Sequence, residues 1–125
     1  VIVVVLCILT TSMAGWMLTR DGGRMSGFIT MLFLSSMLVP FQSFMIPIAK
    51  MANSMQINNT ISGYIWIQVS LYAPMGIFMY QGFTKNVPIS LEESAKLDGA
   101  RPVQVFFGIV CPLMKPITTS ITGVY

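Results

Sequence analysis

Most of the charged side chains in this chain lie in one stretch, residues 88–116, or just before it. The stretch holds three of the four acidic residues, Glu92, Glu93 and Asp98. Neighbouring carboxylates can take part in acid–base catalysis, but the chain has no histidine, no glycine-rich phosphate loop and no nucleophile beside a base. The sequence therefore predicts no catalytic residue, and the chain is not expected to be an enzyme.

The carboxylates are predicted to lie on a short helix over residues 90–98. Ser90 and Glu93 have the spacing of a capping box, in which each side chain accepts a hydrogen bond from the other residue's amide. Glu92 and Lys96 stand four residues apart, in the order that favours an ion pair along a helix. We expect all of these groups to be solvated.

Gly99 and Pro102 predict a turn after this helix and the start of a second one. Glycine takes the left-handed conformation that ends a helix without steric cost, and proline suits a first helical position. At 1.5 Å per residue the first helix is about 14 Å long, too short to cross a bilayer. A short polar helix between apolar segments is either a solvated connection or a handle for a soluble partner, and the residues alone leave both open.

The composition predicts a membrane protein. Hydrophobic residues make up 54% of the chain, charged residues only 9%, and the mean hydropathy is +0.76, whereas soluble domains carry about 25% charged residues. The net charge of +3 comes without a basic patch among aromatics, so nucleic acid is not an expected partner. Cys7 and Cys111 lie in apolar runs and are expected to be buried thiols. The eleven methionines suit flexible packing better than a metal path, and no metal site is predicted.

Two membrane spans are predicted in the first 50 residues. Residues 1–18 carry no charge, and residues 27–49 are again apolar and uncharged. Because proline removes a helix hydrogen bond, the second span should bend or end near Pro40–Pro47. The bend is either a simple kink or a feature that shapes a transport path, and Pro40 is a candidate residue of that path.

A third span is predicted over residues 61–81, after a polar loop at residues 52–60. Gly63, Ser70 and Gly76 are small residues that let helices approach closely. Gln68 is costly to expose to lipid, so it should face the bundle, as structural glue or as a substrate contact. Aromatic residues in this span are read as interfacial anchors, with sugar stacking as the alternative: Tyr64, Trp66, Tyr72 and Tyr80.

The positive charges predict which side of the membrane each loop occupies. With three spans before it, the loop at residues 82–102 lies on the same side as the loop at residues 20–24. That side holds five basic residues, with Lys115 near its boundary, against Lys50 on the other side, so it is expected to be cytoplasmic. Residues 103–125 are expected to begin a fourth span, and the chain is interpreted as an internal fragment of a longer protein.

The motif ESAKLDGA, followed by Phe106, Ile109, Pro112, Leu113 and Pro116, resembles the cytoplasmic loop of permease subunits of bacterial ABC importers. That loop has the pattern E-A-A, then D-G-A, then I-x-x-P. The segments Val39–Pro47, Asn59-Thr60 and Gly82-Phe83 resemble the carbohydrate-uptake branch, which includes the maltose permeases. The resemblance covers most of residues 36–117. Ser94 replaces the usual alanine and is small enough for the same contact.

The resemblance implies an all-α, polytopic membrane helix bundle whose short cytoplasmic helix is a coupling helix received by an ATPase subunit. Leu91, Ser94 and Ala95 would form the small face that enters a groove of the ATPase, and Glu93 and Asp98 would pair with basic residues there. The implied docking set is Leu91, Glu93, Ser94, Ala95, Asp98, Gly99 and Ala100. The candidates for the substrate path are Gln68, Tyr64 and Pro40.

The resemblance also implies the partners and the location. They are a cytoplasmic ATP-binding cassette ATPase, a second permease subunit of a different sequence, and an extracytoplasmic solute-binding protein, in the inner membrane of a bacterium. ATP would be bound by the partner, so no cofactor is expected on this chain. The expected cargo is a sugar or oligosaccharide. Glycerol phosphate, a polyamine or a peptide is the alternative cargo, and an ATP-independent channel or structural membrane protein is the alternative class.

Overall fold

The computed structural model describes residues 1–124, and within this range the chain is helical without a strand. The long elements are α1 (Ile2–Asp21), α2 (Arg24–Met37), α3 (Phe41–Ser54) and α4 (Ile61–Thr84). The short helix α5 (Ile89–Leu97) follows, and then a run of four pieces: α6 (Pro102–Val105), the π-helical turn η1 (Phe106–Val110), α7 (Cys111–Leu113) and α8 (Lys115–Val124). The all-α fold class is confirmed.

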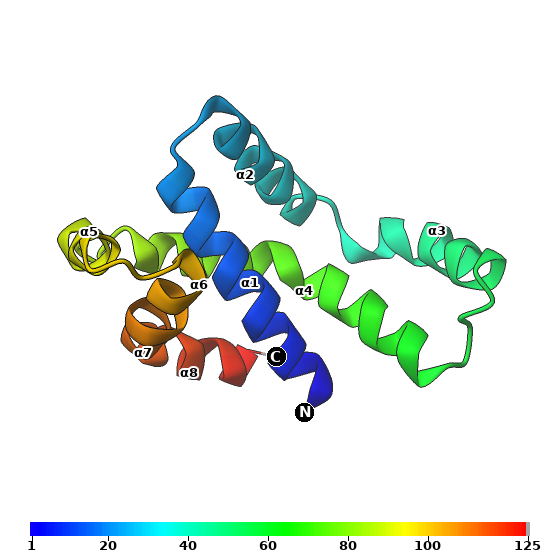
Figure 1. The fold of residues 1–125 in the computed structure, drawn as a ribbon. Coiled ribbons are helices and arrows are strands. Elements are labelled where there is room, and N and C mark those ends of the chain that lie inside the picture. Colours follow the sequence, from blue (N-terminus) through cyan, green and yellow to red (C-terminus); the bar gives the residue numbers. More distant parts are fainter. Residues whose placement is uncertain (125) are drawn as a thin grey trace.

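The helices α1 and α4 make the most extensive contact between elements, and they cross near the middle of the molecule (Figure 1). Gly15 lies at the crossing. A Cβ added to it would lie 2.7 Å from the Tyr80 Cβ and 3.2 Å from the Ile77 carbonyl oxygen. The two backbones are therefore as close as a glycine allows, as in helix pairs packed through small residues.

Of the small residues predicted to permit close packing, Gly63 and Ser70 do not lie at this crossing. Gly76 is buried in α4, but Ser70 is exposed and donates its hydroxyl hydrogen to the Trp66 carbonyl at 2.8 Å. Gly63 faces the preceding loop, where an added Cβ would collide with the carbonyl oxygen of Ile57. Gly15, which brings α1 close to α4, was not among the residues predicted to do so.

One apolar cluster joins α1 and α4 to the segment after α5. Its buried members are Trp16, Tyr80, Val105, Phe106, Val110, Met114 and Ile121. The Trp16 and Phe106 rings lie 5.4 Å apart at 46°, a tilted arrangement favourable for aromatic pairs. The Tyr80 hydroxyl is 2.9 Å from the Thr118 Oγ1, so Tyr80 is a core residue. Its prediction as an interfacial anchor was wrong.

The predicted span at residues 27–49 is two helices, α2 and α3, which meet at an angle of 103°. The break falls at residues 38–40, where Pro40 has an extended backbone (ψ 136°) and precedes the first turn of α3. The predicted bend near Pro40–Pro47 is therefore present at its first proline, because that residue has no amide hydrogen to continue the ladder of α2. Pro47 lies inside α3.

The segment after Pro102 is also bent, by 73° between Leu113 and Lys115. It contains the π-helical turn η1, and π-turns are mostly single insertions into α-helices. Cys111 at the end of this turn is exposed, so the expectation of a buried thiol was wrong for it, whereas Cys7 is buried. Both cysteines are free.

Length and apolar character identify one helix among residues 1–124 that is able to cross a membrane alone, namely α1, which contains an 18-residue stretch with a mean hydropathy of 2.0. Each bent pair adds one more if it forms a single span, which gives up to three. The helix α4 covers the predicted span at residues 61–81 but does not belong to this set. The assignment of that segment as a span stays a prediction.

Candidate functional site

The helix α5 and the turn after it form the candidate site, at one end of α4 (Figure 1). The helix runs from Ile89 to Leu97, close to the predicted residues 90–98. Gly99 follows with φ 84°, the left-handed conformation that its sequence position predicts. The Ala100 amide donates to the Ala95 carbonyl at 3.0 Å, and this bond fixes the exit of the chain.

The predicted capping box of Ser90 and Glu93 is not formed. The helix begins after Pro88, whose carbonyl accepts from the Leu91 amide at 3.3 Å, and no side chain caps it among the described residues. Ser90 is consequently the second helical residue, too far into the first turn to act as the cap. A related bond is present in the next helix, where the Gln104 Oε1 accepts from the Arg101 amide at 2.8 Å.

The predicted docking residues divide between the two faces of α5 and its turn. Five of the seven are exposed to solvent: Leu91, Glu93, Ser94, Asp98 and Gly99. The other two, Ala95 and Ala100, are partly buried and pack against the apolar cluster. The exposed surface thus carries two carboxylates and Leu91, and the inner surface is occupied by the protein itself.

Glu92 lies on the inner surface, and the expectation that it is solvated and paired with Lys96 was wrong. It is 1% exposed, and its carboxylate meets two side chains of α1. The Arg20 Nε donates to the Glu92 Oε1 at 2.9 Å, and the Arg20 Nη2 lies 2.7 Å from the same oxygen. The Trp16 Nε1 donates to the Glu92 Oε2 at 3.1 Å.

The same arginine also binds the backbone that leads into α5, since its Nη2 donates to the Val87 carbonyl at 2.9 Å. Sequence reasoning missed this cluster. One signal was available: Trp16 and Arg20 are four residues apart at the end of an apolar run, so they share a helix face, and that end was predicted to lie on the same side of the membrane as α5. The ion pair agrees with that shared side.

The described residues contain no group of three or more histidine, cysteine, aspartate or glutamate side chains able to hold a metal ion. The chemistry that α5 offers is recognition: exposed carboxylates and a leucine on a short helix whose other face is held in place. When exposed carboxylates pair with basic residues of a partner, the pairs contribute mainly to the specificity and the rate of association.

The predicted substrate-path residues lie away from α5. The Gln68 Nε2 donates to the Tyr64 hydroxyl at 3.0 Å, one turn earlier on the same helix α4. Gln68 also lines a groove of about 490 Å³, together with Phe44, Leu71 and Tyr72. Pro40 is exposed at the bend between α2 and α3. The structure thus brings Gln68 and Tyr64 together, and the two neighbours of Pro40, Val39 and Phe41, line the same groove as Gln68.

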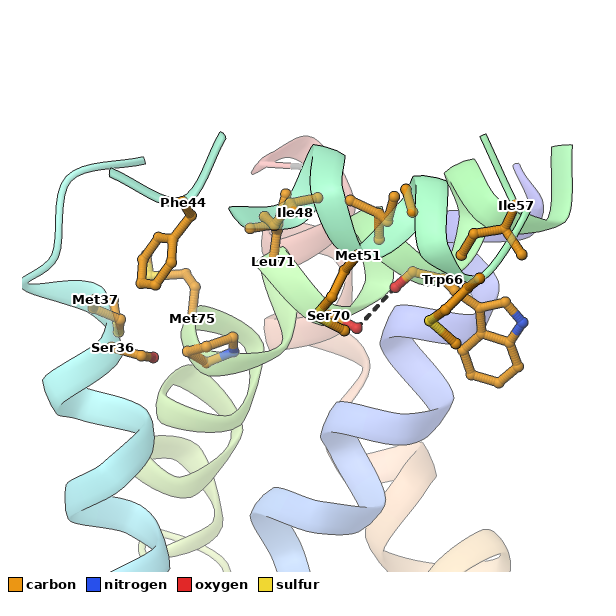
Figure 2. Close-up of a pocket in the computed structure, with 14 residues that line it drawn as sticks. Ser36, Met37, Phe44, Ile48, Met51, Ile57, Trp66, Ser70, Leu71 and Met75 are labelled. Atoms are coloured by element: carbon orange, nitrogen blue, oxygen red, sulfur yellow. Dashed lines mark hydrogen bonds between the residues drawn. The ribbon is translucent and has the colours of Figure 1, made fainter. Parts of the chain in front are cut away.

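A larger cavity of about 890 Å³ separates α3 from α4 (Figure 2). Phe44, Ile48 and Met51 face it from α3, and Trp66 and Met75 face it from α4. Few polar groups reach it; one of them, the Ser70 hydroxyl, is already bonded to the Trp66 carbonyl. A wall of this kind suits apolar side chains or lipid tails more than the hydroxyl groups of a sugar.

The sequence was compared with known proteins. Residues 2–124 match the family described as the inner membrane component of binding-protein-dependent transport systems. The chain is 35% identical over 117 residues to the melibiose/raffinose/stachyose import permease protein of Bacillus subtilis. The aligned region is 93% of this chain and 42% of that protein.

Two further relatives carry names of the same kind. The probable starch degradation products transport system permease protein of Thermoanaerobacterium thermosulfurigenes is 33% identical over 111 residues, 89% of this chain and 40% of that protein. The multiple sugar-binding transport system permease protein of Streptococcus mutans is 34% identical over 107 residues, 83% of this chain and 38% of that protein. The chain thus spans about two fifths of the length of these relatives.

Proposed function

This chain belongs to the family of inner membrane components of binding-protein-dependent transport systems, and we propose that it is part of the permease subunit of an ABC importer for oligosaccharides. In this proposal α5 is the coupling helix, which docks into a groove of a cytoplasmic ATPase. The helices attached to it form part of one half of the translocation path, in the inner membrane of a bacterium. A second permease subunit and an extracytoplasmic solute-binding protein complete the transporter.

The observation that carries the proposal is the two-sided character of α5. Its outer surface exposes Glu93 and Asp98 to a partner, and its inner surface is held by the buried Glu92 carboxylate. The anchoring joins α5 to α1 directly, in addition to the helices that continue its chain. A helix that receives force needs one exposed face for the partner and one fixed face toward the rest of the protein.

The proposed cargo rests on the names of the relatives. Those of the three proteins described above refer to melibiose, raffinose and stachyose, to starch degradation products, and to multiple sugars. We extend this chemistry, a saccharide of two or more units, to the protein that contains this chain. The energy comes from ATP bound by the partner, because the chain offers no phosphate-binding loop of its own.

A co-purification experiment tests the docking. The full-length protein is expressed with its neighbouring transporter subunits and purified in mild detergent. We expect the ATPase to co-purify with the wild type and to be lost from Glu93→Lys, which reverses an exposed charge of the docking surface, and from Gly99→Pro, whose ring cannot adopt φ 84°. The matched control is Lys96→Gln, which removes an exposed charge on the same helix outside the docking set.

Uptake by cells is the second readout, with radiolabelled raffinose, maltotriose and arabinotriose supplied in parallel. We expect ATP-dependent accumulation of at least one of these sugars, loss of it in both docking variants, and normal amounts of each variant in the membrane. Full uptake by Glu93→Lys and Gly99→Pro would contradict docking through α5. Accumulation of glycerol phosphate, a polyamine or a peptide in place of every sugar would contradict the cargo, and uptake with no ATPase would indicate a channel.

A further inference from the structure

The buried carboxylate of Glu92 joins two helices that are far apart in the sequence. Trp16 and Arg20 belong to α1, and Glu92 stands 76 and 72 positions after them on α5. Both carboxylate oxygens are used, Oε1 by the guanidinium and Oε2 by the indole. Arg20 adds a bond to the Val87 carbonyl, so it holds both the helix and the backbone that enters it.

The main contribution of this cluster is to fix the position of α5 relative to α1, and its contribution to the free energy of unfolding is smaller. Buried ion pairs lose much of their attraction to desolvation, and apolar pairs of similar volume often replace them without loss of stability. What the pair adds is geometry, because charge-assisted bonds from a planar guanidinium fix both the distance between two groups and their orientation. The side chain of Arg20 is 17% exposed and that of Glu92 2%, so water weakens the pair little.

The covalent connections of α5 are two short turns with hydrogen bonds of their own. Residues 85–88 join it to α4, and residues 98–101 join it to α6; both are turns outside the helices. Chain connectivity also gives α5 no direct hold on α1, which lies more than 60 residues earlier. The side chains of Trp16 and Arg20 supply that hold, next to the point where Trp16 packs on Phe106.

We propose that Glu92, Arg20 and Trp16 form a buried ionic link that makes α1 move with the coupling helix α5 as one rigid body. The three are positioning residues, and the inference rests on the proposed function, in which an ATPase moves α5. Motion at α5 then reaches the membrane through α1 as well as through the two helices that continue its chain. Since α1 packs tightly on α4 at Gly15, α1 moves against α4 at that contact.

A distance measurement between spin labels tests the link in the assembled, full-length transporter. The labels are attached at Asp21→Cys and Ser90→Cys, both exposed, in a background of Cys7→Ala and Cys111→Ser. The distance is recorded without nucleotide and after trapping with ATP and vanadate. In the parent protein we expect the same narrow distribution in both states, because the two helices move together.

Two variants and a control complete the experiment. Glu92→Gln replaces one acceptor oxygen by an amide donor that faces the Trp16 Nε1, and we expect its distribution to broaden and to differ between the two states. Trp16→Phe removes a single donor and keeps the ring on Phe106, so it serves if Glu92→Gln yields little folded protein; a smaller broadening is expected. Lys96→Gln, an exposed charge loss on α5, should behave as the parent protein.

The outcomes separate this link from the docking of the ATPase. A parent distance that shifts between the two states would overturn the link, and so would variants that match Lys96→Gln. In both cases the ATPase would still co-purify, so the proposed function would stand. A parent complex that contains no ATPase would overturn the proposed function and the link together.

Discussion

Two adjacent glutamates have opposite environments, and the helix period explains the difference. Successive residues of an α-helix point about 100° apart, so Glu92 and Glu93 cannot share a face. Glu92 is buried on Arg20 and Trp16, and Glu93 is exposed. Identical chemistry therefore serves two purposes, one inside the protein and one available to a partner.

Removing the buried carboxylate should destabilise the protein strongly. Glu92→Leu leaves the Arg20 guanidinium without its counter-charge, and breaking a buried pair in this way costs about 3–5 kcal/mol. Glu93→Leu, at an exposed site, should change stability by less than about 0.5 kcal/mol. The measurement is the midpoint of thermal unfolding in detergent. The double variant Arg20→Met with Glu92→Leu should recover most of the loss, and equal loss in the double variant would contradict this account.

Sequence reasoning reached the local features of α5 and missed those set by tertiary structure. Gly99 and Pro102 marked the end of one helix and the start of the next correctly, because glycine and proline act through their own backbone. The capping box failed because Pro88 starts the helix before Ser90. The burial of Glu92 depends on a helix 72 positions away, and a capping pattern carries no information about that.

At the scale of elements, the crossing of α1 and α4 depends on a single missing side chain. Gly15 of α1 leaves room for the Tyr80 Cβ of α4. Gly82 lies in the same helix as Tyr80, but a Cβ added to it would meet no atom of another part of the chain within 4 Å. Glycine in a helix is normally a cost of about 1 kcal/mol relative to alanine. At Gly15 that cost is offset by the close approach of two backbones.

Gly15→Ala and Gly82→Ala should therefore have effects of opposite sign. Gly15→Ala forces the two helices apart, and overpacking of this kind costs about 1–3 kcal/mol. Gly82→Ala meets nothing and should be neutral or stabilising by up to about 1 kcal/mol. Thermal unfolding of the two variants in the same detergent checks the prediction. A Gly15→Ala protein as stable as Gly82→Ala would show that the helices are not tightly packed there.

Pro40 and Gln68, which interrupt the apolar runs, also show which features depend on nearby residues and which depend on packing between helices. Pro40 predicted a bend and the bend is there, since proline acts on its own helix. The size of the bend, 103°, and the cavity that it leaves beside α4 depend on how α3 packs, which a hydropathy pattern does not specify. Gln68 likewise bonds to Tyr64 on its own helix instead of joining two helices.

At the scale of the whole molecule, the ion pair ties the end of α1 to α5, so the loop at residues 22–23 and α5 lie at the same end (Figure 1). The loop between α3 and α4 lies at the other end of α4. Most basic residues, including Arg20, Lys85 and Lys96, belong to the end with α5. The rule that positive loops stay inside therefore favours a cytoplasmic α5.

Labelling with a membrane-impermeant thiol reagent checks this orientation in a Cys111→Ser background. A cysteine at Leu97, which is 89% exposed on α5, should react only after the cells are opened. A cysteine at Met55, 61% exposed beside the loop between α3 and α4, should react in intact cells. The reverse pattern would place α5 outside and would exclude a cytoplasmic motor that binds it.

The position of Gly15 along α1 makes the helix an unequal lever. At 1.5 Å per residue the fulcrum lies about 9 Å from the Asp21 end and about 20 Å from the Ile2 end. If α1 tilts about this point, its far end travels roughly twice as far as the end linked to α5, in the opposite direction. A small displacement of the Asp21 end of α1 would thus produce a larger displacement of the Ile2 end in the opposite direction.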